Sequence, residues 1–484
     1  MPTLEWIGKS KVINHHQEVP FRVLERKYSF DENGQHNEDN GSENMIIRGD
    51  NLEALKALLP RYEGRIKCIY IDPPYNTGNE GWVYNDNVND PKIKKWLGEV
   101  VGKEGEDLTR HDKWLCMMYP RLKLLQKLLA NDGIIFISID DTECSNLILI
   151  CNEIFGASNF VANVSWQRTY SPRNDSKGIV SEVEHLVVFS KNPGWQPNKL
   201  PRTEAMDSRY KNPDNDVAPW KSSDAFAPGA ATHQGMVYAI QHPFTGEMLY
   251  PSNGRCWRYQ QSSMLEYMQG WCNYRLENLH DEKERARVCG IDESAVRKDV
   301  LAIVLEEPLE VSAAKAQKVY NRGRWPGFYF TKGGYGGIAR KTYLENVGGR
   351  LPTNLWMYEE TGHTDEAKKE LISLFGGRSP FDTPKPTRLL DFVLKVAGTS
   401  ETLMLDSFAG SGTTAHAVLN ANKADNGNRH FILIEMMDYA DSITAERVKR
   451  VIKGYGEGKN AVDGTGGNFS FYDLGEPLLM GDCL

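Results

Sequence analysis

The sequence lacks any long apolar run. No stretch reaches the roughly 20 apolar residues that a membrane-spanning helix needs. The first residues, MPTLEWIGKSK, also lack the pattern of a secretory signal peptide, in which a charged segment precedes an apolar one. We therefore expect a cytoplasmic protein that has no membrane partner.

Cys-x-x-Cys pairs and an excess of positive charge are missing as well. The 8 cysteines include no such pair, so we expect neither a zinc ribbon nor any other bound metal, and we interpret the cysteines as structural. The formal net charge is −8, which does not by itself point to a polyanionic partner. Residues 199–350 nevertheless have a slight excess of lysine and arginine, and one basic face is enough to follow phosphates.

Strand and helix patterns alternate in two separated parts of the chain. In the first part, the apolar run IKCIYI at 66–71 predicts a buried strand, and residues 114–130 have helical periodicity. The alternation stops near residue 191 and resumes after residue 350, where a strand is expected at 402–405. We therefore predict an α/β fold in which one mostly parallel sheet is built from two pieces of sequence around an inserted domain.

The sequence Asp72-Pro73-Pro74-Tyr75 directly follows the strand expected at 66–71. Ligands of open α/β sheets bind beyond the carboxyl ends of the strands, so these residues should face a crevice. Consecutive prolines restrict the backbone and fix the directions of Asp72 and Tyr75. A plain strand-ending turn is the alternative, but the full sequence at this place favours a functional role.

These residue types suit chemistry on the amino group of adenine. The amino lone pair is delocalised into the ring and is a poor nucleophile toward a methyl sulfonium. A carboxylate (Asp72) and a backbone carbonyl (Pro73) that accept the two amino hydrogens favour a tetrahedral nitrogen with its lone pair aimed at the methyl group. The base must leave the duplex, and stacking on the Tyr75 ring returns roughly 1–3 kcal/mol. Positioning and electrostatics suffice, without a covalent enzyme intermediate.

A second motif, DSFAGSGTT from Asp406 to Thr414, follows the strand expected at 402–405 and opens a helix. Glycines at such a turn allow a ligand to approach the backbone closely, although helix packing alone also explains a glycine pair. The turn lacks the P-loop lysine and the third glycine of the dinucleotide fingerprint. Glu435, at the end of the next expected strand, could accept both hydroxyls of a ribose. Together these residues favour a cofactor that contains adenosine.

Three further residues support the same pocket with less force. Asp50 could accept a hydrogen bond from the adenine of the cofactor or simply cap the following helix. Lys385 and Pro386 open a helix before the glycine turn, so they could line the methionine end of the cofactor or only start that helix.

The order of the motifs resembles the β-class amino-methyltransferases, and especially the modification subunits of type III restriction systems. DPPYNTG precedes DSFAGSGTT, and the similar stretches include GDNLEAL, EHLVVFSKN and KPTRLLDFVL. The resemblance implies a Rossmann-like, circularly permuted S-adenosylmethionine-dependent methyltransferase fold with an inserted target-recognition domain. It implies catalysis at Asp72, Pro73 and Tyr75, to which we add Pro74. It implies cofactor contacts at Asp50, Asp406, Phe408, Gly410, Gly412 and Glu435, to which we add Ala409, Ser411, Thr413, Lys385 and Pro386.

The expected organisation is a first catalytic segment at 1–195, a target-recognition domain at 196–350, a second catalytic segment at 351–455 and a C-terminal tail at 456–484. The expected function is adenine N6 methylation of double-stranded DNA in a restriction-modification system, by a homodimer that could work with a helicase and nuclease subunit. The leading Asp72 favours adenine over cytosine. Methylation of the cytosine N4 amino group, an RNA substrate and a non-catalytic DNA-binding specificity subunit stay open as alternatives.

Sequence readout is assigned to the insert, which mixes arginine with aromatic residues. The residues predicted to contact DNA are Arg255, Trp257, Arg258, Arg322, Arg324, Lys332, Arg340 and Lys341. For any one of them, a solvated surface charge is the commoner role. The segment 76–112, with Trp82 and Tyr84, is expected to be a flap over the extruded base, or else a loop without a role.

Overall fold

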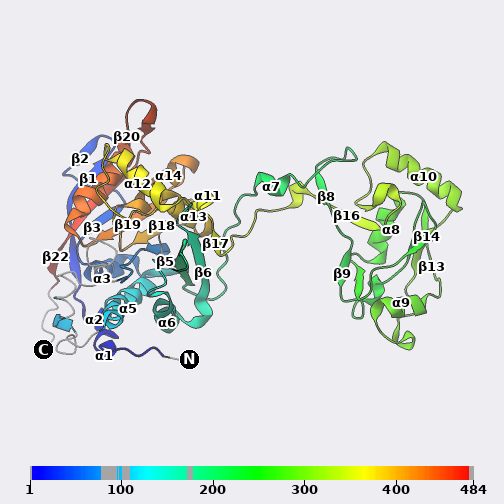
Figure 1. Ribbon diagram of the computed structural model, residues 1–484, viewed down its shortest axis with the longest axis horizontal. Coiled ribbons are helices and arrows are strands. Elements are labelled where there is room, and N and C mark those ends of the chain that lie inside the picture. The colour runs from blue at the N-terminus through cyan, green and yellow to red at the C-terminus, as the bar shows by residue number, and fades with distance from the viewer. Residues whose placement is uncertain (1–2, 78–94, 96–97, 101–108, 172–177, 479–484) are drawn as a thin grey trace. The chain divides into compact units, whose positions relative to one another are not determined.

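The computed structural model describes residues 3–77, 95, 98–100, 109–171 and 178–478. The chain forms two compact units, one of residues 1–200 with 351–484 and one of residues 201–350 (Figure 1). From the sequence, the insert was expected at 196–350. Most of the expected flap at 76–112, including Trp82 and Tyr84, lies outside the described residues.

An eleven-stranded sheet forms the centre of the first unit. Its middle consists of parallel strands from both pieces of the sequence. In spatial order they are β5 (Leu129–Ile139), β4 (Ile66–Ile71), β18 (Leu403–Asp406), β19 (His430–Glu435) and β3 (Met45–Arg48). Strands β4 and β18 are direct neighbours, with Leu405 opposite Ile69. The predicted α/β fold with a mostly parallel sheet is confirmed.

Strands added at both edges complete the sheet. Beyond β5 lie β7 (Val183–Ser190), β6 (Phe160–Gln167) and β17 (Leu355–Trp356), and beyond β3 lie β22 (Asn468–Pro477), β1 (Arg22–Asp31) and β2 (Gly34–His36). The β22 strand pairs in parallel with β3 and antiparallel with β1. The prediction that 456–484 is only a tail is therefore wrong for 468–477, since Phe469 and Phe471 in this strand are buried in the core.

Helices cover both faces of this sheet because strand side chains alternate between the faces. Ile69 and Ile71 belong to one hydrophobic cluster and Cys68 and Tyr70 to another. The first cluster includes side chains of α3 (Asn51–Tyr62), α5 (Arg110–Leu128) and α6 (Cys144–Phe155), and the second includes those of α12 (Thr364–Leu374), α13 (Thr387–Ala397), α14 (Thr413–Asp425) and α15 (Glu446–Lys453). Figure 1 shows α3, α5 and α6 on one side of the strands and α12, α13 and α14 on the other. Short elements of this unit are α1 (Lys9–Val12), α2 (His15–Glu18), α11 (Tyr358–Thr361), β20 (Gly454–Tyr455) and β21 (Val462–Asp463).

The second unit has its own aromatic core, which contains Trp220, Trp257 and Trp271. One sheet has the order β11 (Met248–Leu249), β10 (Ile240–Gln241), β14 (Ala302–Leu305), β13 (Tyr274–Glu277), and another the order β15 (Phe328–Phe330), β16 (Ile338–Tyr343), β8 (Trp220–Asp224). Strands β9 (Phe226–Pro228) and β12 (Arg255–Trp257) pair, and the helices are α7 (Glu204–Asp207), α8 (Gln261–Gln269), α9 (Glu282–Cys289) and α10 (Leu309–Arg322). Helix α9 ends before Gly290, which is left-handed at φ 67°, and the chain then continues to the buried strand β14.

In the described part of the chain, no helix has the length and apolarity to cross a membrane. The 7 described cysteines are all buried with free thiols. Burial raises the pKa of Cys68 to about 12, so this thiol stays protonated and behaves as a small apolar group. The described residues contain no group of three or more His, Cys, Asp or Glu side chains that could hold a metal ion.

Candidate active site

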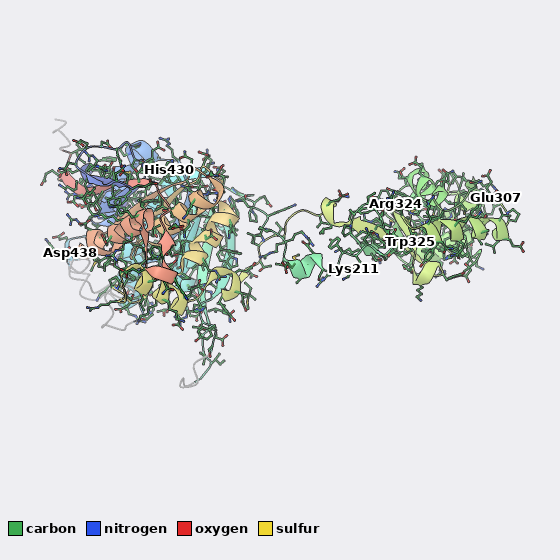
Figure 2. All side chains as sticks on the ribbon, turned by 90° about the horizontal axis from the view of Figure 1, so that it is seen from above. Lys211, Glu307, Arg324, Trp325, His430 and Asp438 are labelled. Carbon is green, nitrogen blue, oxygen red and sulfur yellow. The ribbon has the colours of Figure 1, made fainter. Side chains whose placement is uncertain are left out.

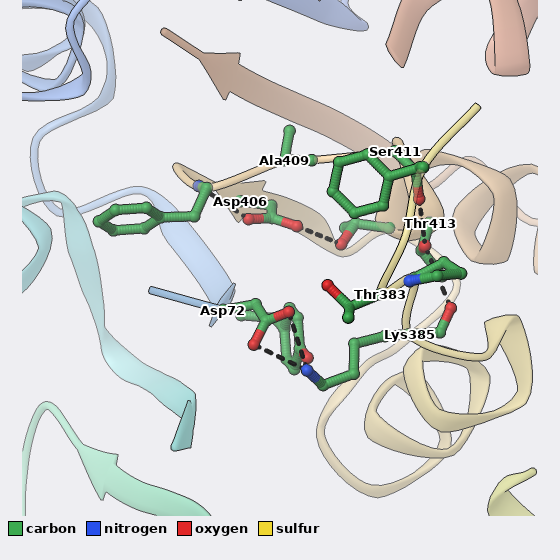
Figure 3. Close-up of a pocket in the computed structure, with 13 residues that line it drawn as sticks. Asp72, Thr383, Lys385, Asp406, Ala409, Ser411 and Thr413 are labelled. Carbon is green, nitrogen blue, oxygen red and sulfur yellow. Dashed lines mark hydrogen bonds and ion pairs between the residues drawn. The ribbon is translucent and has the colours of Figure 1, made fainter. Parts of the chain in front are cut away.

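The two sequence motifs lie at the same edge of the sheet. Because β4 and β18 are parallel neighbours, Asp72 after β4 and the glycine turn after β18 leave adjacent carboxyl ends. They line one cleft (Figure 3). Its walls are Tyr70, Asp72, Phe381, Thr383, Pro384, Lys385, Asp406, Phe408, Ala409, Gly410, Ser411, Thr413 and Thr414. Two stretches more than 300 residues apart in sequence thus form a single site.

Asp72 is buried, and its carboxylate forms an ion pair with Lys385. Lys385 Nζ donates to both carboxylate oxygens at 2.9 Å, as Figure 3 shows. Burial raises the pKa of Asp72, and the lysine opposes that rise. Burial alone would lower the pKa of Lys385, but the charges of Asp72 and Glu184 raise it above its usual value. We conclude that the pair is charged, with Lys385 as the counterion of Asp72.

Tyr75 is held by its hydroxyl group. It accepts a hydrogen bond from Lys385 Nζ at 2.9 Å and donates one to Glu184 Oε2 at 3.0 Å. The turn itself is fixed by Trp114, whose Nε1 donates to the carbonyl of Pro74 at 2.7 Å. Lys385 Nζ also lies 5.0 Å from the centre of the Tyr75 ring, so the ring already has a cation against it.

The glycine turn has the backbone conformation that its sequence suggests. Gly410 and Gly412 have φ of 51° and 80°, which residues with a side chain rarely adopt. A Cβ atom on Gly412 would lie 3.0 Å from the carbonyl oxygen of Thr444. The turn is braced by Glu435, which accepts hydrogen bonds from the amides of Gly410 at 2.8 Å and Met437 at 3.0 Å.

Asp406 begins the turn and is also buried. It accepts hydrogen bonds from the amide of Phe408 at 3.0 Å and from Thr414 Oγ1 at 2.6 Å. Burial raises its pKa to about 7, in spite of these two donors. Its charge state therefore changes near neutral pH.

The structure gives the three less specific candidates local roles. Asp50 caps α3 by accepting from the amide of Leu52 at 2.8 Å, and Arg121 lies 3.3 Å from its carboxylate. Pro386 occupies the N-cap position of α13. The ammonium of Lys385 reaches Asp72, and its carbonyl accepts from Thr413 Oγ1 at 3.2 Å. Cofactor contacts from these three residues stay predictions.

Two residues of the site, Glu184 and Arg447, were not predicted from the sequence. Glu184, at the start of β7, belongs to the stretch EHLVVFSKN, which is similar to the β-class amino-methyltransferases but contains no motif that points to chemistry. Arg447 of α15 is fully buried and donates to Ser411 Oγ at 3.0 Å and Thr413 Oγ1 at 2.9 Å. An arginine in the middle of an apolar helix face was the available signal for this second residue.

The predicted DNA-contacting residues of the second unit fall into three groups. Those exposed at its surface are Arg258, Arg322, Arg324 and Lys332, of which Figure 2 labels Arg324 beside Trp325. Arg255 and Arg340 are partly buried, and Arg255 pairs with Asp224 at 2.7 Å.

Trp257 and Lys341 are the third group and do not match the prediction. Trp257 is buried and donates from Nε1 to the carbonyl of Tyr238 at 2.8 Å. Lys341 Nζ is enclosed by Asp214 and Asp216, each at 2.5 Å. Neither side chain reaches the surface, so both serve the fold of this unit, and we withdraw them as DNA contacts.

Comparison with known proteins agrees with this arrangement. The family model described as DNA methylase (N6_N4_Mtase) matches residues 66–446, so the chain belongs to this family. The type III restriction-modification enzyme StyLTI Mod subunit of Salmonella typhimurium is 32% identical over 440 residues, which cover 86% of this chain and 58% of that one. The EcoP15I Mod subunit of Escherichia coli is 27% identical, over 94% of this chain and 66% of that one. The chain thus spans about three fifths of the length of these Mod subunits.

Shorter relatives and solved structures are similar too. The type II methyltransferase M.KpnI of Klebsiella pneumoniae is 28% identical, over 82% of this chain and 81% of that one. A crystal structure of a DNA modification methylase from Thermus thermophilus, in complex with S-adenosyl-L-methionine, has 12% identity and a TM-score of 0.35, over 89% of this chain and 99% of that one.

Proposed function

We propose that the protein methylates the N6 amino group of adenine in double-stranded DNA, with S-adenosylmethionine as methyl donor, as the modification component of a restriction-modification system. The observation that carries the proposal is the shared cleft, in which a buried carboxylate at the end of β4 faces a left-handed glycine turn at the end of β18. The type III Mod subunits among its relatives and the leading aspartate of the Asp72 motif support adenine over cytosine.

The residues present fit the cofactor. The two positive-φ glycines allow close approach of a ligand to the backbone, and Glu435 and Asp406 bring acceptors to the same turn. Gly410, Gly412 and Glu435 would hold the nucleoside, and Phe408 lines the same cleft. When bound, S-adenosylmethionine supplies an electrophilic methyl group.

The residues of the chain prepare the target amine. Asp72 accepts one amino hydrogen and the carbonyl of Pro73 the other, which directs the nitrogen lone pair. Burial of Asp72 strengthens this hydrogen bond because little water competes for the carboxylate. Trp114 keeps the turn in place through the carbonyl of Pro74. Catalysis then rests on position and electrostatics.

The exposed cations of the second unit are proposed to contact DNA phosphates and base edges. A homodimer and a restriction subunit with helicase and nuclease activity are proposed partners, in line with the Mod subunits that the chain resembles. Light scattering of the purified protein tests the dimer, and a single species with the mass of one chain contradicts it.

The substitution Asp72→Ala tests the catalytic assignment. We expect it to retain S-adenosylmethionine binding in calorimetry and to abolish incorporation of labelled methyl groups into plasmid DNA, because the amine loses its buried acceptor. Asp132→Ala, which removes a surface carboxylate paired with Lys67, is the matched control and should keep the wild-type rate. Near wild-type methylation by Asp72→Ala would refute the assignment.

Mapping of the methylated bases in the same reactions decides between the alternatives. Methyl groups at adenine N6 support the proposal, and methyl groups at cytosine N4 support the other amino-methyltransferase. A protein that binds DNA and incorporates no label would be a specificity subunit.

A further inference from the structure

A cluster of four buried polar side chains lies at the Asp72 end of the cleft. Asp72 and Tyr75 follow β4, Glu184 starts β7, and Lys385 precedes α13. The side chains of the two carboxylates and the lysine are 11%, 10% and 8% exposed. Two carboxylates thus share one lysine, away from bulk water.

Lys385 lies closer to Asp72 than to Glu184. Lys385 Nζ lies 2.9 Å from both Asp72 oxygens and 3.5 Å from Glu184 Oε2. An ammonium has three protons, and the two Asp72 oxygens with the hydroxyl of Tyr75 account for all of them. Glu184 is therefore the next acceptor for the ammonium of Lys385, and the ammonium reaches it by moving much less than the length of its own side chain.

The position of Lys385 conflicts with the role proposed for Asp72. In this structure the lysine engages both oxygens that a target amino group would use. A positive charge also develops on the amino nitrogen when it takes up a methyl group, and an ammonium on the same carboxylate raises the energy of that state. The lysine must leave at least one Asp72 oxygen before transfer.

We propose that Glu184 is a positioning residue that receives Lys385 when the target amino group binds to Asp72. The inference rests on the proposed methyl transfer. Before the target base binds, Lys385 neutralises Asp72. When the target amino group is bound, Lys385 pairs with Glu184 and Asp72 contacts the amino nitrogen without a cation beside it. Glu184 is prepared for this role because Arg168 donates to its Oε1 at 3.1 Å and Tyr75 to its Oε2 at 3.0 Å.

The substitution Glu184→Gln removes the charge and keeps the size and the acceptor for Tyr75. We expect kcat for methyl transfer to fall about 10- to 100-fold, the range of a lost charge-assisted hydrogen bond. KM for DNA and the calorimetric Kd for S-adenosylmethionine should stay near the wild-type values, which also shows that the variant folds. Glu184→Asp should recover part of the rate, and Glu182→Gln, two residues earlier in the chain, should have the wild-type rate.

A second variant separates this role from simple support of the fold. In Lys385→Met no cation has to be moved, so adding Glu184→Gln should cause little further loss of kcat. Asp72 then faces Glu184, Tyr75, Tyr70 and Asp406 without its cation, so its pKa rises and the rate of Lys385→Met should increase with pH.

The outcomes distinguish the two proposals. A wild-type kcat for Glu184→Gln, or the same fold loss in the wild-type and Lys385→Met backgrounds, overturns the role of Glu184 and leaves the proposed function intact. A wild-type protein that methylates no DNA overturns both.

Discussion

Buried lysines in the two units have contrasting surroundings. Lys385 has two carboxylates at unequal distances, 2.9 and 3.5 Å, and lines a cleft. Lys341 has Asp214 and Asp216 at the same distance of 2.5 Å and also donates to the carbonyl of Trp325 at 2.8 Å. Equal, complete coordination holds a side chain in one place, whereas unequal coordination next to a cleft leaves a second position available.

The substitution Lys341→Met should therefore act on stability. It leaves two buried carboxylates without their cation, and we expect a loss of about 3–5 kcal/mol in the free energy of unfolding of the second unit. Denaturant unfolding monitored by tryptophan fluorescence measures it, because Trp220 lies 5.0 Å from Lys341 Nζ. Unchanged stability with weaker DNA binding would instead restore the sequence-based role of Lys341.

Asp406 makes the stability of the first unit depend on pH. Its ordinary pKa of 3.8 rises to about 7 on burial, so the folded protein holds a proton that the unfolded chain releases. The stabilisation from this group is full below about pH 4 and is lost as the pH rises through about 7. We expect Asp406→Asn to remove this loss of stability with rising pH. The difference in the free energy of unfolding between the variant and the wild type should therefore change between about pH 4 and about pH 7. A difference that does not vary with pH would contradict the assigned pKa.

At the scale of elements, the parallel core could be predicted from the sequence, and the strands β1 and β22 at one edge of the sheet could not. IKCIYI predicted β4 with its observed bounds, because an apolar run of this length, rich in isoleucine and bounded by polar residues, is too short for a buried helix and fits a buried strand. Strands β1 and β22 were not predicted from the sequence because register shifts interrupt the alternation of exposed and buried residues, and because neither strand carries a chemical motif. A strand at the end of a glycine-rich stretch looks like a tail until its partner is known.

The site divides in the same way. Asp72, Tyr75, Gly410 and Gly412 were predictable because special chemistry or backbone conformation restricts the residue type. Glu184 and Arg447 were not, since each acts only through partners that are distant in sequence and that the fold brings near. The same limit explains why Lys385 was assigned to the cofactor, although its ammonium contacts Asp72 and Tyr75.

Gly412→Ala tests the glycine turn. An alanine at φ 80° is strained by about 1–2 kcal/mol, and its Cβ would also press on the carbonyl of Thr444. We expect lower stability together with weaker S-adenosylmethionine binding in calorimetry. Gly64→Ala is the matched control, because Gly64 has φ 67° and a Cβ atom there would have no neighbour within 4 Å. It should lose stability alone, and equal cofactor affinity in both variants would refute the role of the turn.

At the scale of the whole molecule, we propose that the first unit carries out methyl transfer and that the second unit contacts DNA. Combined alanine substitution of the exposed residues Arg258, Arg322, Arg324 and Lys332 should weaken DNA binding and reduce the slope of log K against log salt by up to about 0.9 per lost phosphate contact. The cofactor affinity should not change. Fluorescence anisotropy over a salt series measures the slope.

The control removes the same charge from the first unit. Lys27, Arg61, Lys368 and Lys395 are exposed there, and their combined alanine substitution should leave the salt slope near the wild-type value. Equal reductions in the two variants would mean that net charge, and not the surface of the second unit, determines the affinity for DNA.

The place of β22 in the sheet has a consequence for biosynthesis. During translation β3 emerges among the first 50 residues, but both of its neighbours, β19 and β22, are made more than 380 residues later. Until then the growing polypeptide displays an unpaired apolar strand, which invites wrong pairing. Residues 201–350 form a compact body of their own and can fold at the ribosome while the first unit still waits for its closing strand.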